Sequence, residues 1–193
     1  MKELKMTLKP YVAGLILACL PLSACGAGSP GSSEKNLQTL ESGPISVKVP
    51  ESWIDVDADS VTDIWTAGKQ NAENEQATSQ VRLAKRVESP PYADAANQKL
   101  LMQNSIGDDG FASGGVEDVQ VKGSDGAQLA KFTYTEPEGR TWKGRYVSAV
   151  NRESGIVATV EILTLEKGGM SDEEMQSIVK GIQYDKSAEQ DSK

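Results

Sequence analysis

Two cysteines and no histidine limit the chemistry open to this 193-residue chain. Cys19 lies within an apolar run near the N-terminus, and Cys25 follows directly after that run. A chain without histidine lacks the usual neutral-pH general base, the Ser-His and Cys-His nucleophile pairs and the commonest metal ligand. Catalysis would require a Ser-Lys pair or paired carboxylates, and no spacing in the sequence singles out either.

Alternating carboxylates at Asp55, Asp57 and Asp59 are the candidate metal ligands. Three acidic residues spaced in this way begin an EF-hand calcium loop, which also needs glycine at the sixth position and glutamate at the twelfth. Ser60 and Thr66 occupy those two positions. The sequence therefore predicts no metal site and no cofactor.

A strand rich in aromatic and basic residues is the candidate binding surface. Trp142, Gly144 and Tyr146 share one face of the predicted strand. Two interpretations remain open: the rings fill the core, or they border a shallow apolar groove that takes a lipid, a glycan or a peptide. Three basic residues lie beside them: Arg140, Lys143 and Arg145. In so acidic a chain, such a basic patch would suit anionic headgroups or envelope polymers, whereas the alternative is an ordinary exposed strand face.

The N-terminal segment is typical of a signal peptide. Lys2, Lys5 and Lys9 precede a short apolar run that ends at Leu22, which is too short and too interrupted for a membrane span. Leu22-Ser23-Ala24-Cys25 resembles the lipobox of bacterial lipoproteins. That resemblance implies cleavage before Cys25, a diacylglyceryl group on its thiol, and anchoring to the cell membrane on the extracytoplasmic face, since two or more acyl chains give stable anchoring.

Removal of residues 1–24 leaves one domain with a net charge of −10, because the three lysines and one glutamate removed change the counts from 20 basic and 28 acidic to 17 and 27. This charge makes nucleic acid a poor partner. We expect four segments: a signal peptide (1–24), a lipidated N-terminus and flexible linker (25–42), a single α+β domain (43–184) and a disordered tail (185–193).

Alternating hydrophobicity predicts an antiparallel sheet of about six to seven strands. Ile45 to Val49 is a half-buried strand, a hairpin loop at Gln70 to Gln76 leads into a strand from Ser79 to Val87, and a meander runs from Val116 to Leu165. Gly and Asp residues at 108–115 predict a loop between the helix and the meander. Two helices are expected, at Tyr92 to Ile106 and after Ser171, where Ser171 and Glu174 form a capping box.

This order of elements resembles the PsbP/Mog1-type fold as found in actinobacterial LpqN-type lipoproteins. The resemblance rests on Ile45-Ser-Val-Lys-Val-Pro-Glu-Ser-Trp53 at the entry and on the hairpin from Arg145 to Leu165. It implies an accessory or binding protein of the cell envelope without a shared active site. We therefore expect a non-enzymatic module with an envelope protein, a glycan or a lipid as its partner. The alternative is an envelope hydrolase whose carboxylate pair is assembled only in the fold.

Overall fold

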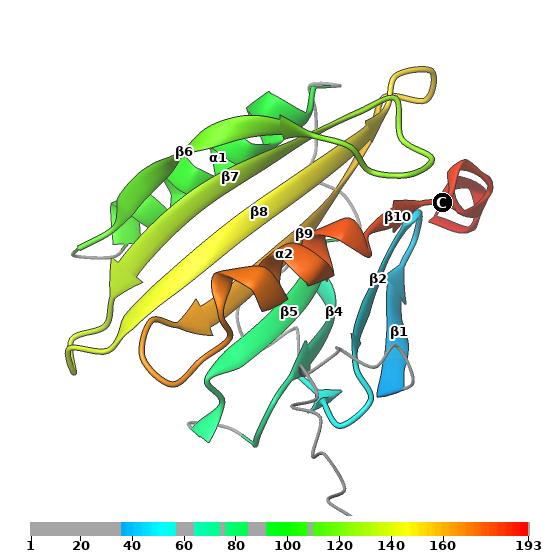
Figure 1. The fold of residues 1–193 in the computed structure, drawn as a ribbon. Helices are drawn as coiled ribbons and strands as arrows, with labels where there is room; N and C mark the ends of the chain where they lie inside the picture. The colour runs from blue at the N-terminus through cyan, green and yellow to red at the C-terminus, as the bar shows by residue number, and fades with distance from the viewer. Residues whose placement is uncertain (1–35, 57–63, 74–75, 85–91, 108–109, 193) are drawn as a thin grey trace, which may run out of the picture. The chain divides into compact units, whose positions relative to one another are not determined.

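The structure, a computed structural model, describes residues 36–56, 64–73, 76–84, 92–107 and 110–192, all within one compact unit, Glu34–Lys193 (Figure 1). Its elements are β1 (Leu37–Ser42), β2 (Ile45–Pro50), β3 (Ile54–Asp55), β4 (Trp65–Gln70), β5 (Ser79–Ala84), α1 (Ala93–Gly107), β6 (Ala112–Val119), β7 (Gly126–Thr135), β8 (Thr141–Asn151), β9 (Ile156–Leu165), α2 (Asp172–Lys180), β10 (Gln183–Tyr184) and a short 3₁₀ helix (Lys186–Ser192).

A seven-stranded antiparallel sheet in the order β3-β4-β5-β9-β8-β7-β6 forms the centre of the fold. Its four C-terminal members, β6 to β9, are the predicted meander, in which each strand pairs with the next through a short connection. Gly139 and Gly155 have positive φ at two of these turns, a conformation that glycine adopts without strain. The α+β class, the antiparallel sheet and the two main helices are confirmed.

The two helices lie on opposite faces of this sheet (Figure 1). α1 packs mainly on β7 and β8. α2 covers the other face together with the second sheet, which has three strands in the order β1-β2-β10. β2 contacts α2, β5 and β9, so the small sheet and α2 form one layer against the large sheet.

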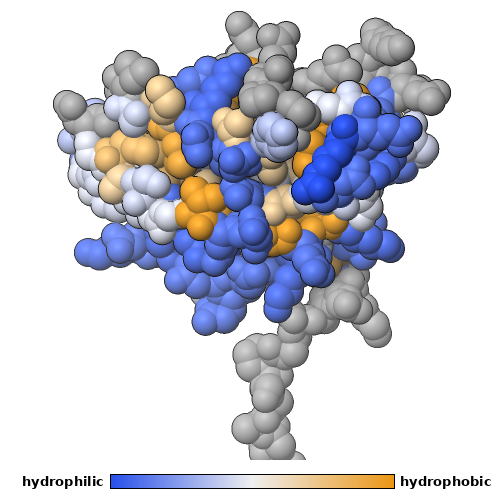
Figure 2. Space-filling view, turned by 90° about the horizontal axis from the view of Figure 1, so that it is seen from above, coloured by the Kyte–Doolittle hydropathy of each residue, from blue (hydrophilic) through white to orange (hydrophobic). Residues whose placement is uncertain are grey.

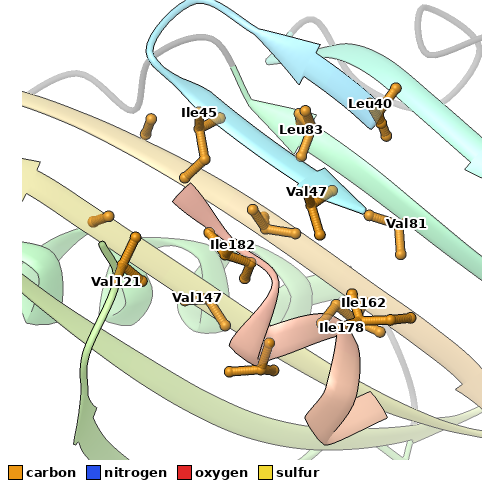
Figure 3. Packing of buried hydrophobic residues seen from close by; sticks show 14 of the residues in the cluster. Leu40, Ile45, Val47, Val81, Leu83, Val121, Val147, Ile162, Ile178 and Ile182 are labelled. Carbon is orange, nitrogen blue, oxygen red and sulfur yellow. The ribbon is translucent and has the colours of Figure 1, made fainter. Parts of the chain in front are cut away.

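The larger hydrophobic core fills the space between this layer and the seven-stranded sheet (Figure 3). The alternation predicted for β2 holds, since Ile45, Val47 and Val49 are all buried. They meet the inward side chains of α2, which include Met175 and Ile178. Each buried aliphatic side chain of this size contributes about 1.5–3 kcal/mol. This core is the principal source of stability for the domain.

The expected linker, residues 25–42, is wrong at its C-terminal end. Residues 37–42 form β1, which pairs with β2 along its full length from Leu37 opposite Pro50 to Ser42 opposite Ile45. Leu40 is the one buried side chain of β1, so its sequence carries almost no alternation. An edge strand of this kind depends on hydrogen bonds to its neighbour, which composition does not reveal.

The expected tail and the expected 108–115 loop are also corrected. Residues 186–192 form the 3₁₀ helix, which is held by the buried carboxylate of Glu189. β6 begins at Ala112 and therefore includes Gly114 and Gly115, with an irregularity in its pairing with β7 between Ser113 and Gly115. Glycine at such a point allows a bulge without ending the strand.

Candidate functional site

Trp142 and Tyr146 lie in the core and do not border an open groove. Trp142 is 7% exposed and Tyr146 is 1% exposed, both on the face of the large sheet that carries α1. The space above Gly144 is filled by the ring of Phe132, which would lie 2.0 Å from a Cβ at that glycine. The Phe132 and Tyr146 ring centroids are 4.5 Å apart. The groove hypothesis is therefore corrected in favour of the core.

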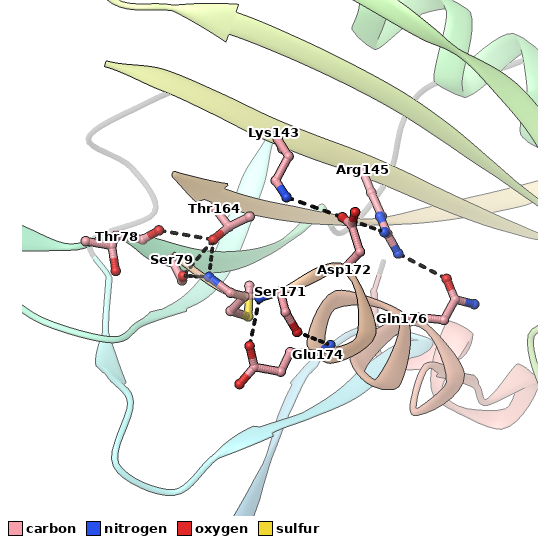
Figure 4. Close-up of polar contacts among 10 residues, drawn as sticks. Thr78, Ser79, Lys143, Arg145, Thr164, Ser171, Asp172, Glu174 and Gln176 are labelled. Atoms are coloured by element: carbon pink, nitrogen blue, oxygen red, sulfur yellow. Dashed lines mark hydrogen bonds and ion pairs between the residues drawn. The ribbon is translucent and has the colours of Figure 1, made fainter. Parts of the chain in front are cut away.

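Two of the three predicted basic residues lie beside the start of α2 (Figure 4). Lys143 and Arg145 point to the α2 face, opposite to Trp142 and Tyr146. Both approach Asp172 in the first turn of α2 at 3.4 Å, and Arg145 Nη1 also donates to Gln176 Oε1 at 3.0 Å. These two cations hold α2 against the sheet.

Arg140 lies at the turn between β7 and β8 and takes a different partner from Lys143 and Arg145. Its Nε donates to Glu136 Oε2 at 2.6 Å. The three basic residues therefore do not form one basic surface.

The start of α2 is fixed by short-range hydrogen bonds (Figure 4). Ser171 Oγ accepts from the Glu174 N–H at 3.2 Å, and Glu174 Oε2 accepts from the Ser171 N–H at 2.7 Å, which confirms the predicted capping box. Just before the helix, the Met170 N–H donates to Thr164 Oγ1 at 2.6 Å. α2 is thereby joined to the end of β9.

A buried ion pair lies on the α1 face of the large sheet. Arg82 of β5 stands opposite Glu161 of β9, and Arg82 Nε and Nη2 both contact Glu161 Oε2. The residues are 5% and 1% exposed, and the guanidinium carbon lies 4.9 Å from the Trp65 ring centroid. Burial opposes the guanidinium charge, but the Glu161 carboxylate outweighs it and the pKa of Arg82 is raised. The pair is an internal contact between strands.

A second polar chain on this face links α1 to the sheet. Asn97 Nδ2 donates to the Gln128 carbonyl oxygen at 3.0 Å, and Ser148 Oγ lies 2.7 Å from Asn97 Oδ1. Thr159 Oγ1 is a further 2.7 Å from Ser148 Oγ. Sequence reasoning missed Asn97, although it lies within the predicted helix at Tyr92 to Ile106, because an isolated asparagine on a helix gives no sign of its partner.

A shallow cleft lies between the β6–β7 connection and the C-terminal end of α2, with a volume of about 600 Å³. We call it the β6–β7 cleft. Its lining residues are Val119, Gln120, Val121, Lys122, Ser124, Asp125, Gly126, Ala127 and Lys180. A smaller hollow of about 330 Å³ adjoins it at Lys122 and continues to Gly43 and Pro44 of the β1–β2 turn.

The floor of the β6–β7 cleft is held in place by backbone contacts. The Tyr184 N–H donates to the Lys122 carbonyl oxygen at 2.8 Å, and Lys122 forms a parallel bridge with Gln183 that connects the two sheets. Gly123 has φ +90°, and a Cβ there would lie 1.9 Å from the Tyr184 carbonyl oxygen. Only glycine permits this approach. Buried Val121 anchors the connection in the core.

The charge of the β6–β7 cleft is predominantly positive. Asp125 is its carboxylate, and it accepts from Lys186 Nζ at 2.5 Å and from the Arg152 N–H at 2.9 Å. These hydrogen bonds hold the pKa of Asp125 below its usual value. Within the described part of the chain, neither Lys122 nor Lys180 has an ion pair.

Sequence reasoning missed Lys122 and Lys180. They are 58 positions apart along the chain (180 − 122), and neither belongs to a motif. Gly123 and Gly126 are typical of a turn, and they are the local indication in the sequence that Lys122 lies at a surface.

Five large hydrophobic side chains are exposed among the described residues: Leu37, Ile54, Tyr92, Met102 and Val116. Figure 2 shows one face, on which apolar patches are interrupted by hydrophilic residues. No helix in the described ranges has the length and apolar composition needed to cross a bilayer.

The remaining predicted residues fall outside or at the edge of the described ranges. Cys25 and the whole signal segment lie outside them. Of the three alternating carboxylates, Asp57 and Asp59 are also outside, and Asp55 forms an ion pair with Lys69 at 2.9 Å. Among the described residues, no group of three or more acidic or cysteine side chains could hold a metal ion.

Comparison with solved structures shows a PsbP/Mog1-like fold. The chain is similar to cyanobacterial PsbP (CyanoP) from Synechocystis, with 14% identity, 82% of this chain and 98% of that chain covered, and a TM-score of 0.56. It is also similar to the Ran-binding protein Mog1p of Saccharomyces cerevisiae, with 15% identity, 79% and 98% covered, and a TM-score of 0.50.

A weaker similarity links the chain to LpqN, described as involved in cell envelope biogenesis of Mycobacterium tuberculosis, with 13% identity, 76% and 84% covered, and a TM-score of 0.45. No family model matches the chain, and no curated protein matches it in sequence. The similarities therefore concern the fold.

Proposed function

We propose that the chain is a non-enzymatic binding or accessory module of a bacterial cell envelope, anchored to the membrane through a lipid on Cys25 and exposed on the extracytoplasmic side. The anchor is supported by the sequence Leu22-Ser23-Ala24-Cys25 at the end of a short apolar run. Its partner is an envelope protein, a glycan or a lipid. The acidic composition argues against nucleic acid.

The observation that carries the binding role is the contrast between buried and surface polar groups. The buried carboxylates Glu161 and Glu189 are both engaged inside the fold, with Arg82 and with Tyr184 respectively. The β6–β7 cleft instead presents Lys122 and Lys180 without ion-pair partners among the described residues. Charged groups that are positioned and unpaired at a surface favour recognition.

The fold is compatible with such a role, because the similar protein Mog1p is described as Ran-binding. No observation on the described residues favours the alternative, an envelope hydrolase. Such an enzyme would need two carboxylates facing each other across a pocket. The two buried carboxylates occur instead on β9 and in the 3₁₀ helix, each with its own partner.

The anchor is tested by metabolic labelling with palmitate in a bacterial host. We expect Cys25→Ser to abolish labelling and to leave the precursor uncleaved, because the acyl acceptor is lost. Cys19→Ser is the matched control: it removes the other cysteine and should leave labelling and processing intact. Undiminished labelling of the Cys25→Ser protein would overturn the anchor.

Exposure on the extracytoplasmic side is tested separately by adding protease to spheroplasts. The unmodified chain should be digested while a cytoplasmic marker survives. Protection of the chain from protease would contradict the proposed location.

A further inference from the structure

We propose that the β6–β7 cleft binds a phosphate monoester, held between the ammonium groups of Lys122 and Lys180. This inference rests on the proposed binding role and names the class of ligand. Lys122 comes from the connection between two strands and Lys180 from the last residue of α2, and both line the same cleft. The fold alone brings these two residues to one cleft.

Two lysines that share one cleft are informative because no carboxylate of a described residue forms an ion pair with either of them. Among the other described lysines, Lys69, Lys131, Lys143 and Lys186 are paired with carboxylates and Lys48, Lys99 and Lys167 are not, so the shared cleft is what distinguishes Lys122 and Lys180. The position of Lys180 at a helix C-terminus is explained by the helix dipole, which favours a cation there. The dipole does not explain Lys122, which lines the cleft and whose backbone is fixed by Tyr184 and Gln183.

The carboxylate in the cleft does not cancel these charges. Asp125 is engaged by Lys186, and the two form a neutral pair at one side. Arg152 adds a further cation nearby, because its Nη2 would lie 3.5 Å from a Cβ on Gly126. The lining is therefore positive within a domain whose overall charge is negative.

The number and type of the cations favour phosphate. A phosphate monoester carries a charge of about −1.5 to −2 at neutral pH and presents three acceptor oxygens. Two ammonium groups balance that charge and offer compact, strongly charged donors. A ligand with a single carboxylate would balance the charge of only one of the two ammonium groups. The open volume of about 600 Å³ leaves room for the group that carries the phosphate.

The cleft is also preorganised, which lowers the entropic cost of binding. The buried Val121 side chain and the Ser124 hydroxyl, which donates to the Val121 carbonyl oxygen at 2.9 Å, fix the connection. On the opposite side, the Gly181 N–H donates to the Ile178 carbonyl oxygen at 2.9 Å and closes the last turn of α2.

The test uses the purified full-length chain with glycerol 3-phosphate as the probe, measured by isothermal titration calorimetry. We expect Lys122→Gln and Lys180→Gln each to weaken binding by about tenfold, since each removes one charge-assisted contact. Lys122→Arg should retain most of the affinity because it keeps the charge. Lys99→Gln is the matched control: it makes the same change at an exposed site on α1 and should not weaken binding.

Two further arms identify the source of the phosphate. Phosphatidylcholine vesicles containing phosphatidic acid present a lipid-borne monoester, and the Cys25→Ser chain tests binding to them without its own anchor. If Lys122→Gln abolishes vesicle binding and glycerol 3-phosphate competes with it, the ligand is the phosphate of a lipid headgroup. If the chain binds glycerol 3-phosphate but not the vesicles, the ligand is a soluble phosphorylated compound.

Equal loss of affinity in Lys122→Gln, Lys180→Gln and Lys99→Gln would overturn the proposal, because it would show a general charge effect. Absence of measurable binding by the unmodified chain would overturn it as well. Thermal unfolding of each variant checks that the fold is intact. Palmitate labelling of Cys25 does not depend on the cleft, so failure of this inference is distinguishable from failure of the proposed anchor.

Discussion

At the scale of single residues, the pair Arg82 and Glu161 shows how an ordinary alternating strand acquires a buried charge. Alternation places Arg82 on the opposite face from Val81 and Leu83, and on an exposed sheet that face would be solvated. Here both faces of the large sheet are covered, so Arg82 is buried and meets Glu161 on the adjacent strand. A buried ion pair of this kind stabilises the fold only while both partners remain.

We expect Glu161→Gln to lower the free energy of unfolding by about 3–5 kcal/mol, because it leaves the Arg82 charge buried without a counterion. Urea denaturation followed by circular dichroism measures the change. The double variant Arg82→Met with Glu161→Leu should recover most of the loss, since it removes both charges. A loss in the double variant as large as in the single variant would show that packing, and not charge compensation, sets the effect.

Which charged residues would be buried, and which surface lysines would meet, could not be predicted from the sequence. The alternation around Arg82 fixed its face, but its partner Glu161 is 79 positions away. The aromatic residues on β8 were correctly placed on one face, but the Phe132 ring that fills the space above Gly144 comes from β7. Lys122 and Lys180 line one cleft in a fold where β10 binds the β6–β7 connection, a contact that no local pattern predicts.

At the scale of elements, α2 was the most predictable part of the chain because its signals are local. The capping box at Ser171 and Glu174, and the stripe that includes Met175, Ile178 and Val179, lie within one short segment, and all three stripe residues are buried. α1 was also predicted to within one residue at each end. β1 was missed for the opposite reason: its pairing with β2 is not local, and its side chains are mostly exposed or only partly buried.

We expect Ser171→Ala to lower the free energy of unfolding by about 1 kcal/mol, because the Glu174 N–H loses its hydrogen-bond acceptor at the start of the helix. Thermal and urea denaturation measure the change. Ser177→Ala makes the same substitution inside α2 at an exposed position, where alanine favours the helix. Equal destabilisation by the two variants would contradict a specific capping role.

At the scale of the whole described unit, Tyr184 and the 3₁₀ helix connect the small sheet to the large one. The Tyr184 hydroxyl donates to Glu189 Oε1 at 2.8 Å, and Asn151 Nδ2 at the end of β8 donates to the same oxygen at 3.0 Å. Burial, together with the hydrogen bond to Glu189, raises the pKa of Tyr184 well above its usual value. The C-terminal residues therefore belong to the folded unit.

This raised pKa predicts a loss of stability at alkaline pH. The folded state resists ionisation of Tyr184, so its contribution is complete below the unfolded pKa of about 10 and is lost as the pH rises above it, by up to about 1.4 kcal/mol per pH unit. Urea denaturation between about pH 8 and about pH 11 measures this slope, because that range spans the tyrosine pKa of about 10 in the unfolded state. Tyr184→Phe should flatten it, with Tyr92→Phe at an exposed site as the control. Identical slopes in the unmodified chain and Tyr184→Phe would refute the prediction.

The direction of β1 places its closing turn, and not its first residue, beside the cleft. The strand enters the fold at Leu37, opposite Pro50, and runs about 17 Å, at about 3.3 Å per residue, before it turns at Gly43 beside the hollow that adjoins the cleft. β1 therefore begins at the end of the strand pair away from Lys122, and its closing turn contributes Gly43 and Pro44 to the hollow that shares Lys122 with the cleft.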